Sequence, residues 1–195
     1  IRSRGLGDVY KRQIFTSSNA IKNLDLTKVD KKIECYCVGS RTEKVAKLNG
    51  FQNIISAEGN VNNLKELILQ NFDSKNGSLL YVSGEVVSSR LDKDLISEGY
   101  SLKRLINYTV SSTLEIKEEF RAELKKSIPD IIYVYSENSA KSLLNLLKKY
   151  ELLDSWMNTN LMCMGEKSSS ILNEIKWKKI FLFNPGEEEF LLYKI

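Results

Sequence analysis

Two short polar segments carry residue types that can hold an anion. Gly39-Ser40-Arg41-Thr42 and Gly165-Glu166-Lys167-Ser168 each follow an apolar run and precede a helical pattern. A glycine lets the backbone come close to a ligand, and the free amides and hydroxyls of a first helical turn bind negative charge. For each segment alone, an ordinary helix N-cap is the favoured interpretation. The pair therefore predicts either plain caps or a shared anion site.

A second pair of segments repeats this pattern. Thr16-Ser17-Ser18 returns as Ser136-Glu137-Asn138, and Glu58-Gly59 returns as Pro185-Gly186 in the same order along the chain. Recurring segments in one order indicate a duplicated structure. We therefore expect two related α/β halves with a ligand cleft between them, and the duplication favours the shared anion site over plain caps.

The residues that are absent exclude several mechanisms. The chain contains no histidine, which excludes a Ser-His-Asp triad, a Cys-His pair and a histidine metal site. No Gly-rich dinucleotide or Walker-type phosphate motif occurs. The three cysteines, Cys35, Cys37 and Cys163, are expected to be buried free thiols in a reducing compartment, and no metal site is predicted.

One tyrosine is a candidate proton donor. Tyr108 ends an apolar run beside the inferred boundary between the halves, where a phenol can donate a proton or a hydrogen bond to a ligand. By position alone, a structural tyrosine of a strand is the favoured interpretation of Tyr108.

The elements that must position these residues alternate between strand and helix. Short apolar runs followed by amphipathic segments, closed by Gly50 and Gly99, are typical of doubly wound, mostly parallel sheets of the Rossmann or flavodoxin-like kind. The expected strands are 33–38, 52–56, 79–82, 101–110, 131–135, 161–164 and 179–183. The expected helices are 42–49, 61–72, 88–98, a segment from Ser112-Thr113 to Lys126, 139–153, 167–175 and 187–193.

Three segments follow from this pattern. Residues 1–13 fit neither period and are interpreted as a non-native-looking leader; residues 14–110 form a first α/β domain and residues 111–195 a second. The leader holds much of the net charge of +4, and no basic stripe with aromatic residues follows, so nucleic acid is not expected as a partner. No apolar run is long enough to span a membrane, and no secretory signal is visible.

These motifs together resemble the uroporphyrinogen-III synthase family. The family's strand and Thr-Ser turn is similar to 14–20, its Val-Gly-x-x-Thr turn and short helix to 38–50, and its following turn and helix to 58–68. Its Arg, Leu, Leu, Gly and Tyr-x-Thr/Val pattern resembles Arg90, Leu91, Leu95, Gly99 and Tyr108-Thr109-Val110. Its second pair of turns resembles 135–140 and 164–168.

The departures from the family pattern set further expectations. Ser18 and Glu137 replace a frequent proline, Ser168 replaces a threonine, and Ser83-Gly84 replaces Arg-Gly, which removes a cation able to meet a substrate carboxylate. The family's N-terminal strand–helix unit has no counterpart here. We therefore expect the second domain to lack that unit and to expose apolar sheet surface.

The resemblance implies a cytoplasmic, monomeric, cofactor-independent lyase. Its substrate is hydroxymethylbilane, a linear tetrapyrrole that the family closes to uroporphyrinogen III with inversion of the last ring and loss of water. Tyr108 is then the catalytic residue. The implied substrate-binding residues are Thr16, Ser17, Gly39, Ser40, Thr42, Ser83, Gly84, Ser136, Asn138, Gly165, Lys167 and Ser168. The alternatives are a non-catalytic binder of an anionic small molecule and an inactive, truncated homologue.

Overall fold

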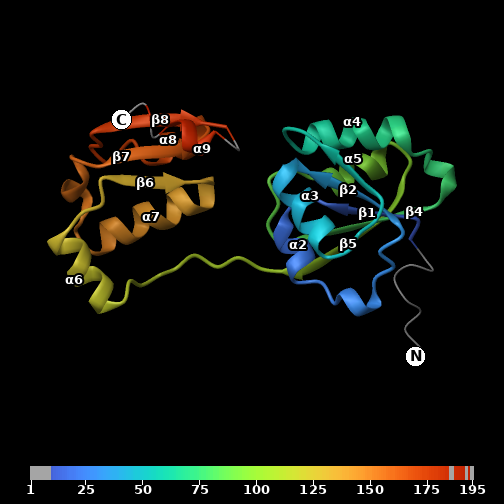
Figure 1. The fold of residues 1–195 in the computed structure, drawn as a ribbon, viewed down its shortest axis with the longest axis horizontal. Helices are drawn as coiled ribbons and strands as arrows, with labels where there is room; N and C mark the ends of the chain where they lie inside the picture. Colours follow the sequence, from blue (N-terminus) through green and yellow to red (C-terminus); the bar gives the residue numbers. More distant parts are fainter. Residues whose placement is uncertain (1–9, 185–186, 192, 194–195) are drawn as a thin grey trace. The chain divides into compact units, whose positions relative to one another are not determined.

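The chain divides into two compact units. The structure, a computed structural model, describes residues 10–184, 187–191 and 193. Unit 1 is Ile1–Val110 and unit 2 is Ser111–Ile195 (Figure 1). Each unit is an α/β structure built on its own sheet, and every strand pair in both sheets is parallel. The expected α/β class with parallel sheets is confirmed.

Unit 1 has a five-stranded sheet in the order β3-β2-β1-β4-β5. The chain therefore runs from β1 outward to one edge and then returns to the other side of β1. The strands are β1 (Arg12–Phe15), β2 (Glu34–Val38), β3 (Ile54–Ala57), β4 (Ser78–Gly84) and β5 (Ser101–Tyr108).

Helices cover both faces of this sheet. They are α2 (Ser18–Lys22), α3 (Gly39–Leu48), α4 (Val61–Asn71) and α5 (Leu91–Ser97), with short 3-10 turns at Leu26–Lys28 and Ser74–Asn76. Helices α2 and α3 pack on one face and α4 and α5 on the other (Figure 1). The central strands are consequently apolar on both sides, and every residue of β4 after Ser78 is buried.

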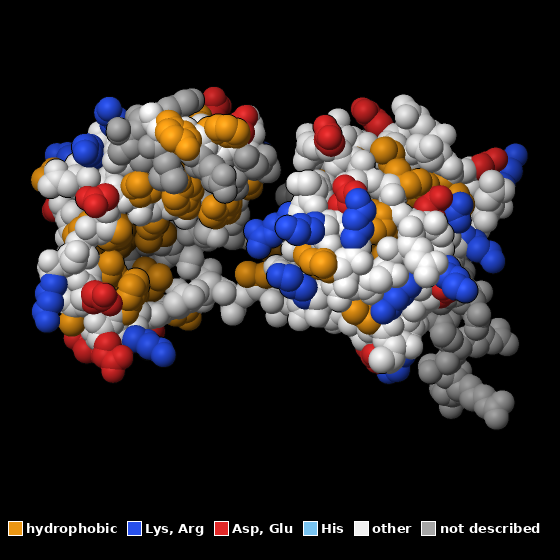
Figure 2. All heavy atoms as spheres, in the orientation of Figure 1, with side chains coloured by type: hydrophobic (Ala, Val, Ile, Leu, Met, Phe, Trp, Pro, Cys, Tyr) orange, Lys and Arg blue, Asp and Glu red, His pale blue; other side chains and the backbone are white. Residues whose placement is uncertain are grey.

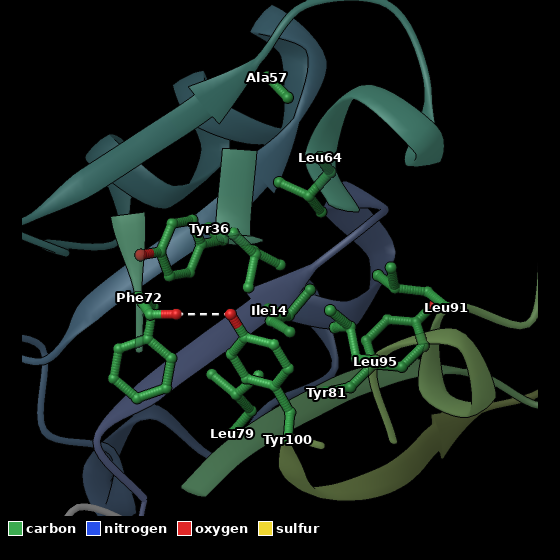
Figure 3. Close-up of a cluster of buried hydrophobic side chains, with 11 residues drawn as sticks. Ile14, Tyr36, Ala57, Leu64, Phe72, Leu79, Tyr81, Leu91, Leu95 and Tyr100 are labelled. Carbon is green, nitrogen blue, oxygen red and sulfur yellow. Dashed lines mark hydrogen bonds between the residues drawn. The ribbon is translucent and has the colours of Figure 1, made fainter. Parts of the chain in front are cut away.

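The core on the α4–α5 face is rich in tyrosine. Figure 3 shows Tyr36, Tyr81 and Tyr100 packed among aliphatic side chains from β1, β4, α4 and α5. Tyr100 Oη donates a hydrogen bond of 2.6 Å to the carbonyl of Phe72, so one phenol in this core is satisfied by the backbone.

Unit 2 has a three-stranded sheet in the order β6-β7-β8, which repeats the order of β1, β2 and β3. Its strands are β6 (Ile131–Val134), β7 (Asn160–Met164) and β8 (Lys179–Phe183). Its helices are α6 (Glu118–Lys126), α7 (Glu137–Lys149), α8 (Glu166–Ile171) and α9 (Glu188–Leu191), with a 3-10 turn at Leu153–Trp156. Trp156 is 2% exposed and belongs to the same buried cluster as Leu144 and Leu147 of α7, beside Trp177.

The segment before α6 is bound to α7. Lys149 Nζ donates to the carbonyl of Leu114 at 2.9 Å, and the amide of Ile116 donates to Tyr150 Oη at 3.1 Å. We name residues 113–116 the strap. Because these contacts hold the strap extended, the helix expected from Ser112-Thr113 begins only at Glu118, and that prediction was wrong.

Unit 2 has exposed apolar side chains on β8 and directly after β6. Tyr135, Ile180 and Leu182 are between 42% and 46% exposed, and Figure 2 shows hydrophobic side chains gathered over unit 2. Within the part of the chain that the structure describes, β6 pairs only with β7, whereas its counterpart β1 pairs on both sides. The expectation that a strand–helix unit is missing remains untested.

Other boundaries differ in detail from the expected ones. Arg12 and Gln13 belong to β1, and Gln13 is 1% exposed, so the expected leader is wrong at its last two residues. Helix α3 begins at Gly39 rather than Thr42, and α5 begins at Leu91 rather than Ser88. Pro185-Gly186, the expected counterpart of Glu58-Gly59, lies outside the described residues. Among the described residues, no helix is long and apolar enough to cross a membrane.

Candidate functional site

The polar turns of unit 1 lie at one edge of its sheet. Because all five strands are parallel, the residues that follow them are at their common carboxyl edge. The strand order reverses between β1 and β4, and in open α/β sheets the crevice at this switch point is where ligands bind. Thr16 follows β1 here and Gly84 ends β4. The sequence-predicted residues Thr16, Ser17, Ser83, Gly84 and Tyr108 are therefore brought to one region.

The turn after β1 is held by two hydrogen bonds. Thr16 Oγ1 lies 3.0 Å from Tyr81 Oη, and Ser17 Oγ accepts from the amide of Asn19 as the N-cap of α2. Tyr81 is 1% exposed, and burial raises the pKa of its phenol, with the Thr16 hydrogen bond acting in the opposite direction. Both predicted hydroxyls of this turn are thus already engaged within the protein.

A register shift at the end of β5 sets the direction of Tyr108. Ser83 pairs with Ile106 but Gly84 pairs with Tyr108, so Asn107 is the extra residue of a β-bulge. Arg104 lies on the face of α4 and α5, over the ring of Tyr81, whereas Tyr108 packs against the core on the other face. The bulge therefore turns Tyr108 away from the side that a regular strand would give it.

Tyr108 lies against the backbone of Gly84. A Cβ atom built on Gly84 would be 2.7 Å from Cε2 and Cζ of the Tyr108 ring. The Tyr108 carbonyl also accepts a hydrogen bond of 3.0 Å from the amide of Glu85. Among the described residues, the Tyr108 hydroxyl has no hydrogen-bond partner. The ring is therefore fixed on one side while the phenol oxygen keeps its capacity to bind a ligand.

The end of β4 is held by a guanidinium that the sequence analysis did not identify. Arg104 Nε donates to Ser83 Oγ at 2.8 Å, and its Nη2 donates to the carbonyls of Gly84 and Glu85 at 2.7 and 2.8 Å. Ser83 is 1% exposed, and its own hydroxyl donates to the carbonyl of Gly84. A guanidinium from the neighbouring strand thus lies at Ser83, where the family pattern has an arginine, and three of its hydrogen bonds go to the protein itself.

A carboxylate balances part of this charge. Asp92 accepts two hydrogen bonds from Arg90, at 3.1 and 3.2 Å, and lies 3.9 Å from Arg104 Nη1. The Arg90 hydrogen bonds lower the pKa of Asp92 against the opposing effect of burial. The cluster of Arg90, Asp92 and Arg104 carries a net positive charge beside the switch point, which suits an anionic ligand.

The glycine turns of the two units share a positive φ, although Gly39 is the first residue of α3 and Gly165 is the N-cap of α8. Gly39 and Gly165 have φ values of 75° and 81°, and a Cβ on either would meet nothing within 4 Å. Glycine is therefore required for its backbone conformation rather than for space. Thr42 and Ser168 are 5% and 2% exposed, inside the first turns of α3 and α8. Ser40 and Lys167, by contrast, are exposed at these turns.

The turn after β6 corresponds to the turn after β1. Ser136 is the N-cap of α7 and accepts from the amide of Ser139, as Ser17 caps α2, while Asn138 is exposed. Tyr135 lies beside this cap and contacts Phe183 with ring centroids 5.5 Å apart. An aromatic surface at the carboxyl edge of β6 and β8 is a feature that the sequence analysis missed.

The thiols carry no ligand chemistry here. Cys35, Cys37 and Cys163 are free and buried, as expected. Burial raises the pKa of the Cys163 thiol to about 11, which keeps it protonated at neutral pH. Across the residues that the structure describes, no group of three or more His, Cys, Asp or Glu side chains is arranged to hold a metal ion.

Two α/β units, each with polar turns at the carboxyl edge of a parallel sheet, define an α/β protein of a class in which that edge is where ligands bind. Residues 4–182 match the family model described as uroporphyrinogen-III synthase HemD. The chain belongs to this family, whose members are cyclising hydro-lyases of tetrapyrrole biosynthesis. A search of curated proteins gave no match.

Two solved structures resemble the chain in fold. One is a uroporphyrinogen-III synthetase from Helicobacter pylori, with 22% identity and a TM-score of 0.66 over 96% of this chain and 85% of the other. The second is a mutant uroporphyrinogen III synthase from the extremely thermophilic bacterium Thermus thermophilus, with 14% identity and a TM-score of 0.54 over 97% of this chain and 79% of the other.

Proposed function

We propose that the chain performs the family's ring closure at the carboxyl edge of its sheets, with Tyr108 as the catalytic residue. The observation that carries this proposal is the placement of Tyr108 beside the switch point, with its ring fixed on Gly84 and its hydroxyl without a partner among the described residues. A fixed donor that needs no reorganisation is what general acid catalysis requires.

The proposed step is assistance to the departing hydroxyl. The Tyr108 phenol donates a proton as the C–O bond of the hydroxymethyl group breaks, so water leaves and an azafulvenium cation forms while Tyr108 becomes a phenolate. The far pyrrole ring attacks through its substituted carbon and gives a spiro intermediate. This intermediate fragments and recloses at the free carbon. That carbon then loses one proton, which replaces the proton that the phenol gave.

Orientation supplies the rest of the catalysis in this proposal. The substrate has eight carboxylates, and closure without inversion occurs spontaneously, so the protein must mainly select one conformation. We propose that turns of both units contact these carboxylates, because the same turn types recur in each. In unit 1 the cluster of Arg90, Asp92 and Arg104 adds positive charge beside the turns.

The proposal also treats the protein as monomeric and cytoplasmic. The three buried free thiols support a reducing compartment. Size-exclusion chromatography with light scattering tests the monomer directly.

The decisive experiment is an isomer assay. The chain is mixed with freshly prepared hydroxymethylbilane, the products are oxidised, and uroporphyrins I and III are separated. Isomer I forms without enzyme and serves as the internal control. Enrichment of isomer III is expected. Isomer I alone, from a chain shown to be folded and to bind the substrate, would instead identify a non-catalytic binder.

A further inference from the structure

Arg104 is the most heavily bonded side chain at the carboxyl edge of unit 1. Its guanidinium donates to three oxygens of consecutive residues, Ser83 Oγ and the carbonyls of Gly84 and Glu85. Only 16% of the side chain is exposed. Three of the five N–H groups of this guanidinium are engaged by protein acceptors, and its Nη1 lies 3.9 Å from Asp92. This degree of engagement points to a role in what Arg104 holds.

What Arg104 holds is the backbone that supports Tyr108. Gly84 forms the surface on which the Tyr108 ring lies, and Glu85 donates its amide to the Tyr108 carbonyl. Both residues present their carbonyls to Arg104 Nη2. A shift of this backbone would therefore move the ring and the main chain of Tyr108 together.

The influence of Arg104 on Tyr108 passes through the backbone rather than through space. The β-bulge at Asn107 leaves the two side chains on opposite faces of the sheet, Arg104 over Tyr81 and Tyr108 against the α2–α3 core. Asn107 adds a second anchor, because its Nδ2 donates to the carbonyl of Ala20 in α2 at 2.7 Å.

We propose that Arg104 is a positioning residue that holds the Gly84–Glu85 backbone in the place from which Tyr108 acts. This proposal rests on the role of Tyr108 in the proposed function. It assigns a second role to Arg104, whose side chain lies on the opposite face of the sheet from Tyr108. Lysine cannot replace arginine here, because an ammonium group is a point donor and cannot span three acceptors that a planar fork reaches.

The test is a double-mutant cycle on the whole chain. Arg104→Lys, Arg104→Gln and the control Lys103→Gln are made in the natural background and in a Tyr108→Phe background. Lys103 is an exposed cation one residue earlier on the same strand. Initial rates of isomer III formation give kcat and KM, and circular dichroism confirms that each variant is folded.

The expected result is a loss in kcat that depends on Tyr108. Arg104→Lys should lower kcat by about tenfold with KM within about twofold, because a misplaced donor weakens the chemical step. In the Tyr108→Phe background the same change should lower kcat by less than about twofold, because residues that act as a unit are not additive. Lys103→Gln should match its parent in both backgrounds.

Three outcomes would overturn the proposal, and they are distinguishable. If Arg104→Lys retains full kcat, charge alone suffices and the fork has no positioning role. If the losses at Arg104 and Tyr108 multiply, Arg104 acts independently of Tyr108 while the proposed role of Tyr108 stands. If Tyr108→Phe retains full kcat, the role of Tyr108 itself is wrong and positioning by Arg104 falls with it.

If the Arg104 variants do not fold, Ser83→Ala tests the same proposal with a smaller change. Ser83→Ala removes the acceptor of Arg104 Nε and the hydrogen bond of the Ser83 hydroxyl to the Gly84 carbonyl, and leaves both carbonyl contacts of Arg104. A fall in kcat at unchanged KM, absent in the Tyr108→Phe background, supports positioning. A rise in KM at unchanged kcat would show that Ser83 serves substrate binding instead, and would count against the proposal.

Discussion

Gly84 lies so close to the ring of Tyr108 that no methyl group fits between them, since a Cβ on Gly84 would be 2.7 Å from two ring carbons. Its φ is outside the left-handed region, so glycine is required at this position for space and not for backbone conformation. Gly39 and Gly165 show the reverse, with open space and positive φ. Unit 1 thus has one glycine whose role is defined by a single aromatic partner.

Gly84→Ala should therefore impair catalysis more than folding. The new methyl group must displace the Tyr108 ring, and a misplacement on the order of 1 Å can cost up to about a hundredfold in rate. The stability cost should be about 1–3 kcal/mol, as for other overpacked sites. Isomer III formation measures the first effect and hydrogen exchange of β4 and β5 amides the second. Unchanged activity would show that Tyr108 can act from a displaced position.

Tyr108→Phe should slow isomer III formation more than any single Ser→Ala change at Ser17, Ser40 or Ser136. The phenol proton is lost while the ring and its packing on Gly84 remain, and general acid catalysis contributes about 10²–10⁴-fold. Each serine is one of many orienting contacts, so its loss should cost less. An equal or smaller effect at Tyr108 would remove it from the catalytic role.

Thr16→Val should destabilise unit 1 by leaving the buried Tyr81 hydroxyl without a partner. The expected cost is about 1–3 kcal/mol, the usual penalty for an unsatisfied buried polar group. Tyr81→Phe in the same chain should restore part of that stability, because both members of the pair are then apolar. Hydrogen exchange of β1 and β4 amides gives the stability of the two single variants and of the double variant. Strictly additive losses would mean that the 3.0 Å contact is not a stabilising bond.

Asp92 should make unit 1 less stable in acid. Its pKa in the folded chain is below the ordinary value of 3.8, chiefly through the Arg90 hydrogen bonds. The stabilisation is therefore fully present above about pH 4 and is lost as pH falls through the lower, folded-state value. Asp92→Asn should lower stability at neutral pH and flatten this acid dependence.

Asp94→Asn is the matched control for that prediction, because Asp94 is on the same helix outside the ion-pair cluster. Hydrogen exchange of unit 1 amides between about pH 7 and pH 3 is the measurement, after correction for intrinsic exchange. Tryptophan fluorescence does not serve, because Trp156 and Trp177 both belong to unit 2. An identical acid dependence in both variants would contradict the role of Asp92.

The alternation of strands and helices was predictable because apolar runs and amphipathic periods are local properties of the sequence. The carboxyl-edge position of Thr16 and Gly39 followed from that alternation, since parallel strands end at one edge. Ser17 and Ser136 are helix N-caps, as the interpretation of these turns as plain caps predicted.

Arg104 and Asn107 were not predictable from the same patterns. The role of Arg104 depends on which strand lies beside β5, and the role of Asn107 on a register shift against β4. The local periodicity of the sequence predicts neither which strands are neighbours nor their register. A cation at an inward position of β5, on the side of Leu102, was the only available signal for Arg104. The start of α6 was missed for a similar reason, because distant contacts to α7 hold the strap extended.

The strap also changes where unit 2 should be taken to begin. A fragment cut at Glu118, the first residue of α6, would lose the chain that Lys149 and Tyr150 bind, and would leave the partly buried Ile116 site on α7 open to water. The exposed residues 109–112 just before the strap form no helix or strand beyond the end of β5. Limited proteolysis should cut there and release unit 2 with the strap still attached as its N-terminal arm.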